Sequence, residues 1–124
     1  MGYFFAVIRI GIYALVFGVF VVIGVCGHVL FFMSPPRLLK WIAFFAQMWA
    51  RVTCSVLNIQ VQIEGNASIK PGSLIVANHV GSPDIFVLGA TFKGFFVSKT
   101  EVADWPLFSC LAKLGKTIFT DRSK

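Results

Sequence analysis

An uncharged apolar run near the start of the chain limits what this protein can fold into more than any other feature. Residues 10–32 are 23 consecutive positions without Asp, Glu, Lys or Arg. As a helix they would extend for about 34 Å, which is enough to cross the hydrocarbon core of a bilayer. A cleavable signal peptide fits less well, because bulky residues at 31–33 stand where small ones precede a cleavage site. The run therefore predicts a membrane helix.

The composition agrees with a membrane protein. The chain is 57% hydrophobic and 13% charged, whereas soluble domains average about 25% charged residues. An ordinary soluble domain and a disordered chain are both excluded, since disorder requires low hydrophobicity. The three cysteines, Cys26, Cys54 and Cys110, have no metal-binding or CxxC spacing, so we expect reduced, buried thiols. His28, within the apolar run, is expected to have only a packing role.

The positive charge is unevenly distributed. The net charge is +6, and the residues before position 56 include four basic side chains and no acidic one. A basic, apolar first half indicates contact with an anionic membrane surface, and nucleic acid is the weaker interpretation. One basic residue, Arg9, precedes the apolar run, and three (Arg37, Lys40 and Arg51) follow it. This asymmetry predicts that the rest of the chain lies on the cytoplasmic side of the inner membrane.

A second helix is predicted directly after Pro35 and Pro36. Between 37 and 51 the polar residues follow one another at helical spacing and form a single stripe on an otherwise apolar helix: Arg37, Lys40, Gln47 and Arg51. Such a pattern is typical of a helix lying in the membrane interface. The alternative is a helix buried in the protein with one wet edge.

The pattern changes near residue 56, where short strands begin to alternate with helices. Alternating apolar residues predict a strand over 56–63, and a continuous apolar run predicts a buried central strand over 74–77. The chain then predicts a helix over about 82–90, a strand over 95–98, a helix from Pro106 to Gly115 and a strand over 117–120. This order indicates an α/β fold with a mostly parallel sheet and flanking helices. We therefore expect three parts: a membrane helix (1–34), an amphipathic interfacial helix (35–55) and an α/β domain (56–124).

One pair of residues is a candidate for catalysis. His79 follows the predicted strand 74–77 directly, and the carboxyl ends of strands are where α/β proteins place their sites. Asp84 stands in the first turn of the next predicted helix, so that its carboxylate could orient the imidazole as a general base. Alternatively, Asp84 only interacts with the positive end of the helix dipole.

The residues from Asn78-His79 to Asp84 resemble the NHx4D motif of PlsC-like 1-acylglycerol-3-phosphate acyltransferases. Two further blocks follow in the same order as in that family. One is Phe96 to Glu101 with Trp105-Pro106-Leu107, and the other is Gly115 to Arg122, a strand ending in Asp-Arg. The resemblance covers about residues 56–124.

The resemblance implies a role for each matching residue. His79 would take the proton from the free hydroxyl of a lysophospholipid such as 1-acyl-glycerol-3-phosphate, and Asp84 would orient His79. Arg122 would bind the phosphate of the acceptor, and Lys99 would add positive charge near the site. The acyl donor would be acyl-CoA or acyl-carrier protein as co-substrate, with no other cofactor, no metal and no nucleic acid.

The match to the family pattern is incomplete. Gly81 stands where the family often has Ser, and the later Pro-Glu-Gly-Thr-Arg-like block is absent. We therefore expect an incomplete acyltransferase fold, the front portion of a longer enzyme. Two other functions stay open: a non-catalytic membrane-anchored lipid-binding relative, and a membrane-bound thioesterase that uses water in place of the lipid hydroxyl.

Overall fold

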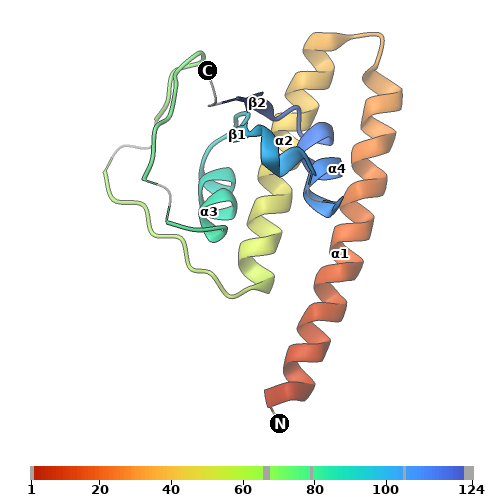
Figure 1. The fold of residues 1–124 in the computed structure, drawn as a ribbon, viewed down its shortest axis with the longest axis vertical. Coiled ribbons are helices and arrows are strands. Elements are labelled where there is room, and N and C mark those ends of the chain that lie inside the picture. Colours follow the sequence, from red (N-terminus) through yellow and green to blue (C-terminus); the bar gives the residue numbers. More distant parts are fainter. Residues whose placement is uncertain (1, 66–67, 79, 105, 122–124) are drawn as a thin grey trace.

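The structure is a computed structural model that describes residues 2–65, 68–78, 80–104 and 106–121. In chain order the elements are α1 (Gly2–Phe31), α2 (Pro35–Val56), α3 (Pro83–Thr91), β1 (Val97–Lys99), the 3-10 helix η1 (Thr100–Asp104), α4 (Pro106–Leu114) and β2 (Ile118–Thr120). Figure 1 shows two long helices side by side, with α3 on the side of α2 that faces away from α1.

The two long helices form an antiparallel hairpin. The connection is short because the backbone N–H of Ser34 donates to the carbonyl of Phe31 at 2.9 Å, which closes the turn after α1. Pro35 and Pro36 then start α2, where the missing proline N–H removes no helical hydrogen bond. The predicted helix boundary at the two prolines is confirmed.

The hairpin is held by a close contact between Gly27 of α1 and the indole of Trp41 of α2. Gly27 is buried, and a Cβ atom added there would collide with the ring. Next to this contact the Trp41 ring stacks on Phe45 with centroids 5.4 Å apart, and Phe45 lies 4.8 Å from Phe20 of α1. A residue larger than glycine would therefore force the two helices apart.

Helix α3 packs closely on α2. A Cβ atom added at Gly89 would lie 3.1 Å from the Cβ of Ala50, so the two backbones approach as near as small residues allow. Ala50 and Cys54 of α2 and Ala90 of α3 form the buried cluster at this contact. Trp49 contacts Phe86 edge-to-face, with ring centroids 5.4 Å apart. This α2–α3 contact is the core of the described part of the protein.

The described sheet is small and parallel. β1 pairs with β2 in the register Val97–Ile118, Ser98–Phe119 and Lys99–Thr120. The crossover between them contains η1 and α4, as expected for a parallel pair. The predicted strand–helix–strand order over 95–120 is confirmed, although each strand has only three residues.

Two predicted strands are wrong. α2 continues to Val56, and residues 59–64 are extended without forming a ladder. The run 74–77 is neither a strand nor buried, since Leu74 is 81% exposed and Val76 is 85% exposed. An extended segment becomes a strand only when another strand satisfies its N–H and C=O groups, and no described segment pairs with these two.

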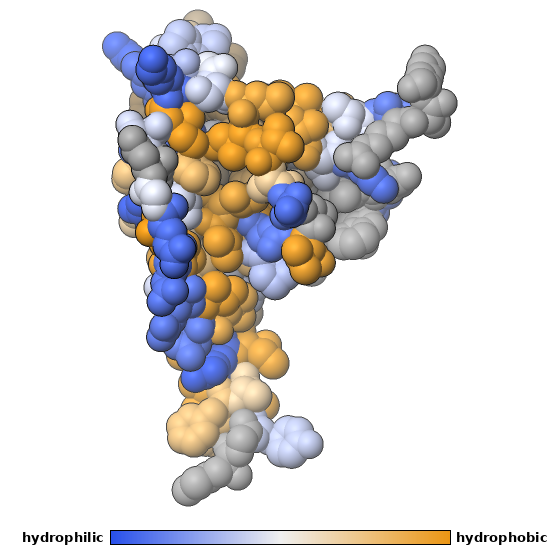
Figure 2. All heavy atoms as spheres, turned by 90° about the vertical axis from the view of Figure 1, so that its left-hand side faces the viewer, coloured by the Kyte–Doolittle hydropathy of each residue, from blue (hydrophilic) through white to orange (hydrophobic). Residues whose placement is uncertain are grey.

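Helix α1 leaves its apolar side chains open. Tyr3–Phe31 is the one helix in the described residues that is long and apolar enough to cross a membrane. It extends further toward the N-terminus than the predicted run, so Arg9 lies inside the helix instead of preceding it. Large apolar side chains are exposed along its length, among them Phe4, Leu15 and Leu30. Figure 2 views the molecule from the left-hand side of Figure 1, away from most of α1, and shows hydrophobic atoms exposed beside hydrophilic ones on that face as well. The exposed surface of α1 favours membrane association.

The polar stripe of α2 does not face a single environment. Arg37 and Lys40 are exposed, but Gln47 is only 6% exposed and is turned toward α3. The second half of the stripe therefore contacts protein, as in the alternative of a buried helix with a wet edge. The expectation of three buried thiols is also wrong, because Cys54 is buried while Cys26 and Cys110 are exposed.

The contact between Gly27 and Trp41 leads to a test. We expect Gly27→Ala to lower the free energy of unfolding by about 1–3 kcal/mol, because the added methyl group overpacks the hairpin. Gly24→Ala is the matched control, since nothing lies within 4 Å of a Cβ there. It should be neutral or stabilising by up to about 1 kcal/mol. The free energies of unfolding of both variants are measured in detergent micelles by circular dichroism. Equal stabilities of the Gly27→Ala and Gly24→Ala variants would contradict the packing described.

Candidate functional site

The candidate site is built around the carboxylate of Asp84 at the start of α3. Its Oδ2 atom accepts hydrogen bonds from the backbone N–H of Val80 at 2.6 Å and of Gly81 at 3.0 Å. The backbone N–H of Asp84 in turn donates to the carbonyl of Gly81 at 3.1 Å. These three bonds close residues 80–84, here called the Asp84 turn. The carboxylate is half-buried and its orientation is fixed by main-chain groups.

The local sequence explains why the helix begins here. Ser82 is the N-cap residue and Pro83 occupies the first helical position, as predicted. The Ser82 side chain makes no capping hydrogen bond. The Asp84 side chain instead binds N–H groups that precede the helix, at the end where the helix dipole also favours a negative charge. Both interpretations of Asp84, catalytic and electrostatic, are compatible with this position.

The other three predicted site residues differ in what the structure says of them. His79 and Arg122 lie outside the described residues, so their predicted roles stay predictions. Lys99 is the last residue of β1, and its side chain is exposed. In Figure 1, β1 lies beyond the C-terminal end of α3, whereas Asp84 is in the first turn of that helix. The described structure does not bring Lys99 beside Asp84.

Sequence reasoning missed the backbone donors of Val80 and Gly81. The available signal was the spacing: Asp84 follows Val80 by four residues and Gly81 by three, in a predicted loop. At this spacing an aspartate side chain can accept hydrogen bonds from main-chain N–H groups. Position 81 contributes its N–H group, which does not depend on the side chain.

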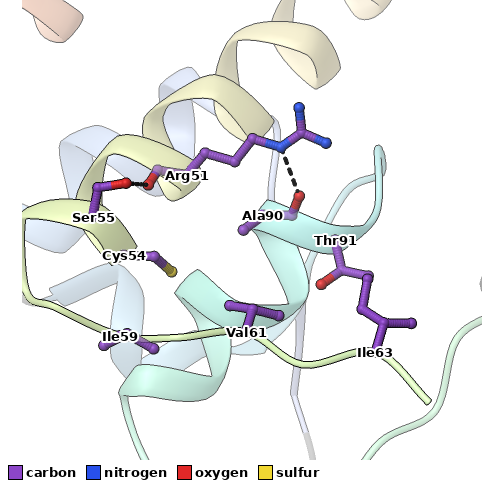
Figure 3. Close-up of a pocket in the computed structure, with 8 residues that line it drawn as sticks. All are labelled: Arg51, Cys54, Ser55, Ile59, Val61, Ile63, Ala90 and Thr91. Carbon is purple, nitrogen blue, oxygen red and sulfur yellow. Dashed lines mark hydrogen bonds between the residues drawn. The ribbon is translucent and has the colours of Figure 1, made fainter.

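A cavity of about 350 Å³ lies at the opposite end of α3 (Figure 3). Residues from the end of α2, the extended segment and the end of α3 line it: Arg51, Cys54, Ser55, Ile59, Val61, Ile63, Ala90 and Thr91. Burial raises the pKa of the Cys54 thiol, so Cys54 is a poor nucleophile there. The described residues of this lining include neither a carboxylate nor a histidine, so none of them supplies the predicted general base or the carboxylate that would orient it.

In the described part of the chain, no three His, Cys, Asp or Glu residues lie close enough together to hold a metal ion. The expectation that the reaction needs no metal stays a prediction.

Comparison with known proteins identifies the family. The sequence profile of the Acyltransferase family matches residues 58–124, more than half of the chain. The chain belongs to the acyltransferase family. A lyso-ornithine lipid O-acyltransferase of Rhizobium meliloti is 31% identical over 112 residues, which cover 82% of this chain and 38% of the relative. A protein of the same name from Pseudomonas aeruginosa is 40% identical over 86 residues, 69% of this chain and 30% of the relative.

A third relative is named for a different acceptor. It is a 1-acyl-sn-glycerol-3-phosphate acyltransferase of Neisseria meningitidis, 31% identical over 74 residues, which cover 59% of this acyltransferase chain and 29% of the relative. The chain spans about a third of the length of these relatives. No solved structure matches it significantly.

The different environments of the thiols give a second test. We expect a water-soluble maleimide to modify exposed Cys110 at pH 7.5 at least tenfold faster than Cys54, whose raised pKa keeps the thiol protonated. Raising the pH should increase the thiolate fraction of Cys54 and narrow the difference between the two modification rates. Mass spectrometry of peptides after timed quenching measures both rates, with the denatured chain as the control in which they converge. Equal rates in the folded protein would contradict the burial of Cys54.

Proposed function

We propose that this protein forms the front part of a membrane-bound enzyme that transfers an acyl chain from a thioester to the hydroxyl of a lysolipid. The membership in the acyltransferase family carries the proposal. The Asp84 turn supports it, because a carboxylate fixed by two N–H groups is suited to orient a neighbouring base. The whole enzyme would act in phospholipid biosynthesis.

The proposed reaction is a direct transfer. His79 takes the proton from the acceptor hydroxyl as its oxygen attacks the thioester carbonyl. The C–O bond forms, the C–S bond breaks, and the thiolate leaves and takes up the proton from His79. Asp84 holds the imidazole in orientation and stabilises its protonated form. The donor is acyl-CoA or acyl-carrier protein, and no further cofactor takes part.

The acceptor has two candidates. The motif resemblance favours 1-acyl-glycerol-3-phosphate, with its phosphate bound by Arg122 and with Lys99 adding positive charge. The names of the relatives from Rhizobium meliloti and Pseudomonas aeruginosa favour a lyso-ornithine lipid, whose ornithine head group carries no phosphate.

The location follows from the first half of the chain. The exposed apolar surface of α1 would lie in the inner membrane, and residues 56–124 would face the cytoplasm, where acyl thioesters are made. A lipid acceptor could then reach the site without leaving the membrane.

The catalytic pair can be tested by substitution. We expect His79→Ala and Asp84→Asn to lower acyl transfer by about 10²–10⁴-fold, since general base catalysis is lost. Asp84→Asn keeps an oxygen that can accept the Val80 and Gly81 bonds, so the turn should persist. Transfer of radiolabelled acyl chains is measured in membranes containing the protein, with exposed Asp104→Asn as the control. An unchanged rate for His79→Ala, or fatty acid release without an acceptor, would contradict the mechanism.

The acceptor can be tested through Arg122. If the phosphate is bound there, Arg122→Gln should raise the KM for 1-acyl-glycerol-3-phosphate about tenfold or more, as expected for loss of a charged hydrogen bond. Lys113→Gln, which removes one exposed charge from α4, is the control. Transfer to lyso-ornithine lipid with no use of 1-acyl-glycerol-3-phosphate would instead establish the second candidate. Lipid binding without turnover of either acceptor would indicate a non-catalytic protein.

A further inference from the structure

Two polar side chains of α2 hold the C-terminal end of α3. The Nε2 group of Gln47 donates to the carbonyls of Ala90 and Thr91, each at 3.2 Å. The Nε group of Arg51 donates to the carbonyl of Ala90 at 3.0 Å, as Figure 3 shows. These carbonyls belong to the last turn of α3, which lacks helical N–H partners. A cation is favourable at this end of a helix as well.

The bonds from Gln47 satisfy a buried amide, because Gln47 is only 6% exposed. A buried amide without a partner costs about 1–3 kcal/mol, so the side chain is stable at this place only while it binds α3. The neighbouring contact between Ala50 and Gly89 leaves no space for α3 to slide closer. Direction and distance of α3 relative to α2 are therefore both defined.

The position of the C-terminal end of α3 determines the position of its first turn. α3 is one uninterrupted helix of nine residues and is about 13 Å long. Its C-terminal end is held by Gln47 and Arg51, and its first turn carries Asp84. α2 is in turn packed on α1, the helix with the exposed apolar surface.

We propose that Gln47 and Arg51 are positioning residues: by holding α3 on α2 they set the place of the Asp84 turn relative to the lipid surface. The proposal rests on the proposed function for its membrane-bound acceptor. It assigns the second half of the α2 stripe to the internal geometry of the enzyme, while Arg37 and Lys40 remain open to lipid head groups or water.

The first experiment compares two acceptors. The double variant Gln47→Met/Arg51→Met keeps the apolar volume and removes the donors. We expect about a tenfold loss of transfer to a long-chain lysolipid in phosphatidylcholine vesicles, as for a misplaced reacting group, and less than a twofold loss with a short-chain, water-soluble lysolipid. Rates are taken per vesicle-bound protein. Lys113→Met, which removes one exposed charge from α4, is the control. A variant with Gln47 intact and Arg51→Lys, which retains a donor at both positions, should keep the rate of the unsubstituted protein.

The results separate positioning from a general structural role. An equal loss with both acceptors, or no loss with either, would overturn the proposal. If the whole enzyme without substitutions transfers no acyl chain to either acceptor, the proposed function fails, and a second measurement that needs no activity then decides the positioning.

That measurement is the depth of the Asp84 turn. A nitroxide spin label is attached at Ser82→Cys in a chain whose three native cysteines are replaced. Its collision rate with oxygen, which dissolves in lipid, is divided by its collision rate with a nickel chelate, which stays in water. We expect the double variant to shift this ratio and Lys113→Met to leave it unchanged. An unchanged ratio in the folded double variant would overturn the proposal.

Discussion

The close packing of α2 between two helices is the constraint on which the described structure depends. Trp41 and Ala50 are nine residues apart, which is two and a half helical turns, so they lie on opposite faces of α2. Each meets a glycine of a neighbouring helix, Gly27 on one side and Gly89 on the other. α2 thereby joins the apolar helix α1 to the helix that carries Asp84. The candidate site has a defined relation to the apolar surface because of these two contacts.

The success of sequence reasoning varied with the range of the interactions involved. The beginnings of α2 and α3 were predicted correctly, because a proline in the first helical turn is a local signal. The strands at 56–63 and 74–77 were wrong although their apolar patterns were typical. Such a pattern describes a segment that can join a sheet, whereas pairing depends on partners distant in the chain. β1 and β2 have each other as partners, and they were predicted correctly.

The site shows the same division. The spacing of His79 and Asp84 pointed to the turn, but it did not reveal that main-chain N–H groups hold the carboxylate. The helical spacing of Gln47 and Arg51 correctly placed them on one stripe with Arg37 and Lys40. Spacing does not tell what a stripe faces, and only packing shows that its second half binds the carbonyls of α3.

The two backbone hydrogen bonds to Asp84 have a consequence for which substitutions the turn can accept. The carboxylate is bound by N–H groups that every residue except proline provides. The side chain of Val80 meanwhile is 91% exposed beside the candidate catalytic group. The side chain at position 80 can therefore vary while the bonds that fix the Asp84 carboxylate are kept. The surface chemistry of the turn and the orientation of its carboxylate can change independently of each other.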